Sequence, residues 1–235
     1  MIALTFDIDW ASDFILTDLL ELLAKSGAKG TFFATHESKI VSDHMVDDHE
    51  VGIHPNFNPN FEGKGENYKT IINRLIDLYP KSTGVRFHSL GHNAHCILHC
   101  SQKGILYDSS VYYPYQSDSF YDYSGIVRVP FQVSDMQRVI DNNLTIDFEN
   151  INPSKLYVLA FHPFHIFINT SSMEQVQAAK SSLRNYKKLS TFKTDYNKKG
   201  VRYLLEKILQ TNNKFITLND HVNNFRSKIS IHNKI

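Results

Sequence analysis

Two kinds of hydrophobic pattern alternate along the chain. Residues 1–9 begin with an apolar run that predicts a buried strand, whereas residues 13–25 repeat apolar positions at helical spacing. The first pattern recurs at residues 30–35, 50–54, 83–88, 104–109, 127–131, 156–161 and 214–218. The second recurs at residues 68–78, 92–103 and 200–209, and Asp220 begins a further short helix.

This order of elements predicts an α/β fold. Strands that alternate with helices form parallel sheets, and seven or eight such strands in 235 residues predict a (β/α) barrel. We expect one domain over residues 1–225, with an aromatic-rich excursion at 112–150 and a polar C-terminal tail at 226–235.

Composition narrows the classes of partner. Lysine and arginine number 25 against 24 aspartates and glutamates, a formal charge of +1. So small a charge creates no field for nucleic acid or an anionic membrane, and we expect neither as a partner. The first residues lack the basic region of a signal peptide and the apolar run breaks at Asp7, so we predict a cytoplasmic protein without a membrane span. The oligomeric state stays open.

Asp7 and Asp9 form a pair of carboxylates at the end of the first predicted strand. Because side chains alternate along a strand, we expect both to point to one face. Two like charges so close repel unless a cation or a shared proton neutralises them, which favours a metal site. The alternative is a pair of solvated aspartates at a strand end.

Other polar residues also end predicted strands. His54, Arg86, His88 and His162 each follow or close an apolar run. Active sites of α/β barrels lie at the carboxyl ends of the strands, where these residues would meet. The sequence therefore predicts one site on one rim of the barrel.

A series of motifs carries a family resemblance over nearly the whole chain. In order they are TFDID at 5–9, GTFF at 30–33, EVGIH at 50–54, Arg86, YDSS at 107–110, LAFH at 159–162 and FITL at 215–218. The chain thereby resembles the polysaccharide deacetylases, carbohydrate esterase family four with NodB homology, and within them a divergent branch associated with bacterial surface-glycan biosynthesis. The resemblance implies a distorted (β/α) barrel with seven or eight strands, an N-acetylated sugar or glycan precursor as substrate, and a divalent metal. Zinc is the expected metal, with cobalt, nickel or manganese as alternatives.

The resemblance also implies roles for the acidic residues and the first histidine. Asp7 matches the general base, and Asp9 matches the metal-binding aspartate although Ile8 separates the two here. His54 matches the first metal-binding histidine. The family's second metal histidine is replaced by Asn58, whose amide oxygen is a poor zinc ligand. Either the affinity for metal is reduced or another group replaces that histidine, and His88 is the candidate third ligand. A histidine that only hydrogen-bonds substrate or backbone is the alternative for His88.

Arg86 and His162 complete the implied catalytic set. Arg86 matches the arginine that pairs with the base, where a nearby cation would keep Asp7 ionised. His162 matches the general acid, and His165 could exchange roles with it or complete the metal site. Tyr112 and Tyr113 begin a run of aromatic residues that could stack on sugar rings, or could instead close a satellite core under a long loop.

Residues 92–100 hold histidines and the chain's two cysteines, Cys96 and Cys100, at helical spacing. They could bind zinc, but we favour buried cysteines with surface histidines.

Two functions from different classes follow. The first is a metal-dependent hydrolase that removes an N-acetyl group from a sugar. The second is a catalytically impaired barrel that binds carbohydrate or forms a complex, an interpretation favoured by the loss of the second metal histidine. The simultaneous presence of base, ligands and acid favours the hydrolase.

Overall fold

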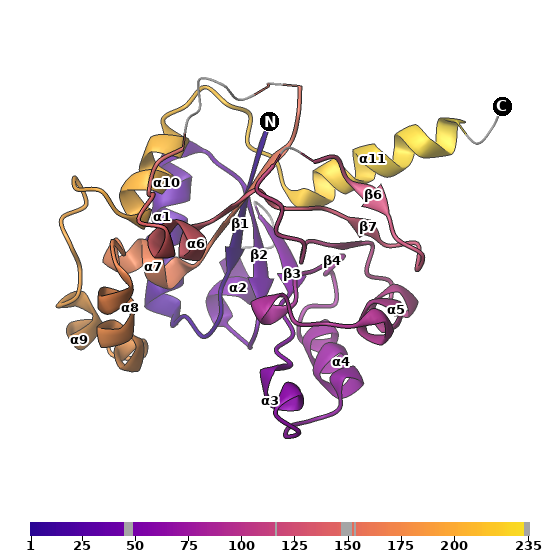
Figure 1. The fold of residues 1–235 in the computed structure, drawn as a ribbon, viewed down its shortest axis with the longest axis horizontal. Helices are drawn as coiled ribbons and strands as arrows, with labels where there is room; N and C mark the ends of the chain where they lie inside the picture. Colours follow the sequence, from indigo (N-terminus) through magenta and orange to yellow (C-terminus); the bar gives the residue numbers. More distant parts are fainter. Residues whose placement is uncertain (45–48, 116, 147–151, 153, 233–235) are drawn as a thin grey trace.

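A computed structural model describes residues 1–44, 49–115, 117–146, 152 and 154–232 (Figure 1). Within them one sheet has the strand order β6-β7-β5-β4-β3-β2-β1-β9-β8, parallel throughout except for the antiparallel pair β6/β7. The strands are β1 (Ile2–Asp7), β2 (Gly30–Ala34), β3 (Glu50–Ile53), β4 (Gly84–Val85), β5 (Tyr107–Asp108), β6 (Phe120–Tyr121), β7 (Val127–Arg128), β8 (Val133–Ser134) and β9 (Tyr157–Phe161). The sheet curls strongly into a half-barrel, which confirms the predicted fold class.

Helices pack around this sheet. They are α1 (Asp13–Ser26), α2 (Lys39–His44), α3 (Asn58–Phe61), α4 (Tyr68–Leu78), α5 (Ala94–Gln102), α6 (Asp135–Ile140), α7 (Pro163–Ile168), α8 (Met173–Ala179), α9 (Tyr186–Ser190), α10 (Val201–Leu209) and α11 (Leu218–His232). Two 3-10 turns, η1 (His88–Leu90) and η2 (Lys180–Ser182), complete the described elements. In Figure 1, α1, α7 and α10 lie together on one side, whereas α4 and α5 lie near β4.

The core forms where the predicted apolar patterns meet. β1 is buried along its whole length between β2 and β9, and its apolar face packs against α1. Helix α1 ends as the sequence predicts, because Gly27 adopts the left-handed conformation (φ 64°) and closes the last turn. The bounds of α4 coincide with the predicted helix 68–78.

The strands at the β4–β7 side are shorter than predicted. Only two residues each of the predicted strands 83–88, 104–109 and 127–131 join the sheet as β4, β5 and β7. Gly84 leaves room for the ring of Tyr107 on β5, since a Cβ at Gly84 would lie 2.0 Å from Cζ of that ring. After Val85 the backbone leaves the sheet and turns at η1, so His88 lies in a turn and not at a strand end.

The C-terminal region also differs from the prediction. Residues 214–218 are not a strand: Phe215 makes one isolated bridge to Ile2, and α11 begins at Leu218. That helix continues to His232, so it includes most of the segment 226–235 that the sequence marks as a polar tail; residues 233–235 lie outside the described part. Residue 116 and residues 147–150 of the predicted excursion also lie outside it. Among the described residues, no helix has the length and apolar character needed to cross a membrane.

Candidate metal centre and active site

Most of the predicted site residues line one cavity of about 590 Å³ at the carboxyl ends of the strands. Asp7, Asp9, His54, His88 and His162 all contribute to its wall. A cavity of about 660 Å³ opens at the amino ends of the strands and contains none of them. The rim predicted from the sequence is therefore a single physical site.

Asp7 is held by a buried arginine. Arg86 is fully buried and donates from Nη1 to Asp7 Oδ1 at 2.9 Å and to Thr5 Oγ1 at 2.8 Å. Its Nε and Nη2 donate to the carbonyl and hydroxyl of Ser109 at 2.8 and 2.9 Å. The rings of Phe33 and Phe131 lie 4.6 and 4.8 Å from the guanidinium carbon. These contacts fix the guanidinium and give Asp7 a permanent cationic partner.

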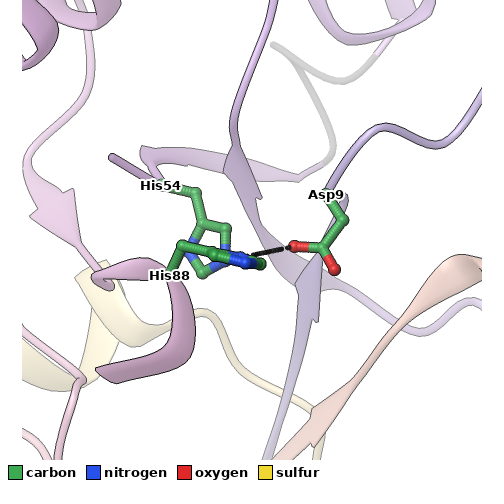
Figure 2. Close-up of side chains that lie close together, drawn as sticks. All are labelled: Asp9, His54 and His88. Carbon is green, nitrogen blue, oxygen red and sulfur yellow. Dashed lines mark hydrogen bonds and ion pairs between the residues drawn. The ribbon is translucent and has the colours of Figure 1, made fainter. Parts of the chain in front are cut away.

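Asp9 lies where two histidines converge (Figure 2). Its Oδ1 is 3.4 Å from His54 Nε2 and 3.1 Å from His88 Nδ1, and the ligand atoms of all three residues lie within 4.8 Å of one another. β1 ends at Asp7, and Asp9 has a left-handed backbone (φ 42°), so the expected strand face shared by the two aspartates does not reach Asp9. The turn after β1, and not strand alternation, brings both carboxylates to the cavity.

The hydrogen bonds of His54 determine which of its nitrogens faces the site. Its Nδ1 donates to the backbone carbonyl of Arg86 at 2.6 Å, because a carbonyl can only accept. Nε2 faces Asp9 and is the ring nitrogen left to bind a metal. Metal-binding histidines are commonly oriented in this way by a hydrogen bond from the other ring nitrogen.

Asp9 remains ionised despite its partial burial. Burial raises the pKa of Asp9, but hydrogen bonds from His54 and His88 and the charge of His162 outweigh it and hold that pKa well below its usual range. One carboxylate oxygen and two imidazole nitrogens suit zinc or another divalent transition metal, and three protein ligands leave a position for water or substrate. The residues present therefore fit the metal that the family implies.

Asn58, which occupies the position of the family's second histidine, is not part of this group. It is exposed, and its Nδ2 donates to Ser89 Oγ at 3.2 Å. His88, the third ligand expected from the sequence, lies in the group with Asp9 and His54. The ring of Trp10 contacts His88 edge to face, with ring centroids 5.2 Å apart.

The two candidate sugar-binding tyrosines differ in position. Tyr112 lines the cavity, is 36% exposed and packs against Phe131. Tyr113 is 45% exposed and is absent from the cavity wall; its ring contacts Tyr115. The structure places Tyr112, but not Tyr113, at the site.

His162 belongs to a second group of one aspartate and two histidines. Its Nδ1 lies 2.8 Å from Asp135 Oδ1, and its backbone N–H donates to Asp135 Oδ2 at 2.6 Å. His165 Nδ1 lies 3.3 Å from the same Oδ2. The other ring nitrogen of His162, Nε2, faces the cavity, 3.9 Å from Asp9 Oδ2.

Asp135 controls the charge of His162. Burial lowers the pKa of His162, but the adjacent Asp135 carboxylate more than offsets this, and the more distant Asp9 and Asp7 add to it, raising the pKa to about 10. Burial likewise opposes ionisation of Asp135, yet the two histidines lower the pKa of that carboxyl. His162 is consequently an imidazolium at neutral pH.

Asp135 was missed by sequence reasoning. It begins α6, after the short β8, and Ser134 caps that helix. The sequence feature at this position is a serine–aspartate pair before an apolar helical run, which is typical of an ordinary helix start and does not point to a functional residue. Only the parallel pairing of β8 with β9 shows that this carboxylate lies beside His162.

The residues 92–100 do not form a metal site in the structure. Cys96 and Cys100 are buried in the core between α4 and α5, and burial raises the pKa of both thiols. His99 bonds Asn73, while His92 stacks on Phe87. The described residues contain two groups able to hold a metal, and neither includes this segment.

Residues 4–180 match the family model described as WbmS-like polysaccharide deacetylase. The chain belongs to the polysaccharide deacetylase family. Its sequence is 30% identical to that of WbmS of Bordetella bronchiseptica, a presumed polysaccharide deacetylase involved in O-antigen biosynthesis. The similarity covers 88% of this chain and 89% of that one, with a TM-score of 0.82.

More distant structures share the fold of this polysaccharide deacetylase family member. A presumed polysaccharide deacetylase of Mycobacterium smegmatis is 15% identical, with 97% and 90% of the two chains covered and a TM-score of 0.56. The peptidoglycan deacetylase PdaC of Bacillus subtilis is 13% identical, with 100% and 96% covered and a TM-score of 0.52. No curated protein matches the chain.

Proposed function

We propose that the chain is a metal-dependent hydrolase that removes the N-acetyl group from an N-acetylated sugar of a surface-polysaccharide precursor. The observation that supports this most strongly is the convergence of a base, three metal-ligand candidates and an acid on one cavity. Membership in the polysaccharide deacetylase family gives the same reaction class. The similarity to a protein described as involved in O-antigen biosynthesis supports the kind of substrate.

The candidate ligands are Asp9 Oδ1, His54 Nε2 and His88 Nδ1. A divalent cation held there would polarise the amide carbonyl and lower the pKa of a bound water. Asp9 contributes the negative charge of the site, while the backbone carbonyl of Arg86 fixes the orientation of His54.

Asp7 takes the proton from the attacking water. Its bond to the Arg86 guanidinium orients one carboxylate oxygen, while Asp7 lines the cavity where the water would lie. Because Arg86 is fully buried and makes four hydrogen bonds, it holds Asp7 in a fixed orientation.

His162 protonates the departing amine. Asp135 keeps it charged at neutral pH and orients Nε2 into the cavity, so a proton is held where the leaving nitrogen would lie. The carbon–nitrogen bond breaks as this proton moves, and acetate and a free amino sugar are released. Tyr112 at the cavity wall offers a flat ring for the sugar.

The test combines metal content with acetate release. The chain is purified, stripped of metal and reloaded with zinc, cobalt, nickel or manganese, and acetate is measured from N-acetylated sugars, nucleotide-activated sugars and glycan fragments. The same assays are made on Asp9→Ala, His54→Ala, His88→Ala and Asn58→Ala. We expect about one metal per chain, lost in the first three variants and retained at saturating metal in Asn58→Ala.

Absence of bound metal under every loading condition would contradict the hydrolase. Metal and sugar binding without acetate release from any of these substrates would instead favour the carbohydrate-binding barrel. Retention of metal in His88→Ala would remove His88 from the ligand set while leaving the reaction class intact.

A further inference from the structure

The segment after His54 runs beside the turn that carries His88. Phe57 packs on Phe87 with ring centroids 5.6 Å apart, and the backbone N–H of His88 donates to the carbonyl of Pro55 at 3.0 Å. Asn58, at the start of α3, donates from Nδ2 to Ser89 Oγ at 3.2 Å. Residues 54–61 thus contact residues 86–91 at several points beside the candidate metal centre.

Phe61 extends these contacts to the end of the turn. Its ring lies over Gly91, where an added Cβ would come within 2.5 Å of the Phe61 ring carbon Cε2. Helix α3 therefore contacts the turn at two points, one polar and one apolar. Residues 57–61 cover this side of the turn.

The turn itself is strained. Ser89 has φ 53° and ψ 20°, and Leu90 has φ 58°, so two consecutive residues with side chains adopt the left-handed conformation. Such residues persist only where the surroundings stabilise them, and they cluster at functional sites. Because His88 directly precedes Ser89, the conformation of Ser89 sets the direction of the backbone at His88.

We propose that Asn58 is a positioning residue for the candidate ligand His88. Through its bond to Ser89 it stabilises the left-handed turn and thereby holds His88 Nδ1 beside Asp9. In this arrangement the side chain at position 58 serves the metal centre without binding the metal. The inference rests on the proposed function, since it requires a metal at Asp9, His54 and His88.

The test measures affinity for Co²⁺ and its visible absorption spectrum in the metal-free full chain. Asn58→Ala should bind Co²⁺ about two- to tenfold more weakly, the range expected for one hydrogen bond, and its cobalt spectrum should change. Asn60→Ala is the matched control, because Asn60 lies on the same helix and donates to the Glu66 carbonyl instead. The control should bind Co²⁺ as the unsubstituted chain does.

A rescue variant separates positioning from ligation. Glycine adopts positive φ at little cost, so Ser89→Gly in the Asn58→Ala background should restore most of the Co²⁺ affinity and the original spectrum. A ligand lost at Asn58 would not be restored by a change at Ser89. The melting temperature of metal-free Asn58→Ala should stay close to that of the unsubstituted chain.

Three results would overturn the proposal. They are unchanged Co²⁺ affinity and spectrum in Asn58→Ala, an equal loss in Asn60→Ala, and failure of Ser89→Gly to restore affinity. In each case Co²⁺ still binds the unsubstituted chain, so the proposed function stands. If the unsubstituted chain binds no Co²⁺, the proposed metal centre and this inference both fail.

Discussion

The site contains two groups of the same composition, each with one aspartate and two histidines. In the first, Asp9 has 31% of its side chain exposed, and its neighbours His54 and His88 contact one of its oxygens from the cavity side. In the second, Asp135 is fully buried and accepts hydrogen bonds from the backbone N–H and the ring Nδ1 of His162. The two groups therefore consist of the same residue types in different surroundings.

The difference lies in what already neutralises each carboxylate. Asp135 is surrounded by hydrogen-bond donors of the chain, so an added cation would have to displace them. Asp9 is approached by Nε2 of His54 and Nδ1 of His88 and borders the cavity, which suits an exchangeable ion. Burial and hydrogen bonding, and not residue type, thus distinguish the proposed metal centre from the group that is proposed to hold a proton.

The largest expected effect is the loss of metal on substitution at the first group. Asp9→Ala or His54→Ala should abolish metal binding and lower kcat/KM by about 10³-fold or more, since the Lewis acid is lost. Asp135→Asn should keep about one metal per chain. Elemental analysis and acetate release measure both; loss of metal in Asp135→Asn would erase the distinction between the groups.

Substitution of the proposed general acid, His162, has the next largest expected effect. His162→Asn should lower kcat by about 10²- to 10⁴-fold while the metal is retained, because the leaving amine loses its proton donor. His165→Asn should have a much smaller effect, because Nδ1 of His165 contacts Asp135, whereas Nε2 of His162 approaches Asp9. If His165→Asn proves the more damaging of the two, the assignment of the acid is wrong.

A smaller effect is expected in the pH profile. The Asp135 carboxylate is the main cause that raises the pKa of His162 to about 10, against the lowering effect of burial. In Asp135→Asn this pKa should fall, so the alkaline limb of kcat/KM should move to lower pH by more than about one unit. An alkaline limb at the same pH in both proteins would show that His162 does not supply the proton.

The smallest effect is on stability. The pKa of His162 is raised from its ordinary value of 6.5, so its pairing stabilises the fold fully below about pH 6.5 and the stabilisation is lost as pH rises through about 10. Between these pH values, the melting temperature of the metal-free chain should therefore fall more steeply than that of the metal-free Asp135→Asn variant. Equal slopes in thermal melts would contradict a strong pairing.

The sequence could predict the fold because its strongest patterns are local. Helix 68–78 and the central strand β1 follow from apolar spacing and from stop signals such as Gly27. The strand predicted at 214–218 was wrong because β1 already pairs with β9 and, from Leu4 onward, with β2, so Phe215 bridges only to Ile2. Periodicity shows an apolar run but not whether the strand that it would join is already paired on both sides.

The residues of the candidate site could be predicted only where a family motif coincides with the end of a strand. Asp7, His54 and His162 lie near the ends of β1, β3 and β9, and the family resemblance pointed to each. The part played by Asp135 depends on the pairing of β8 with β9, and the position of His88 depends on the left-handed turn at Ser89. Neither a distant strand pair nor a positive φ at serine has a reliable local signal.

The contact between Trp10 and His88 has an optical consequence. Trp10 is the only tryptophan in the chain, and its ring lies against a candidate metal ligand. All indole fluorescence of the unmodified protein therefore originates beside the candidate metal centre. A quenching ion such as Co²⁺ or Cu²⁺ bound there would dim this emission, so occupancy of the site could be followed in real time without a label.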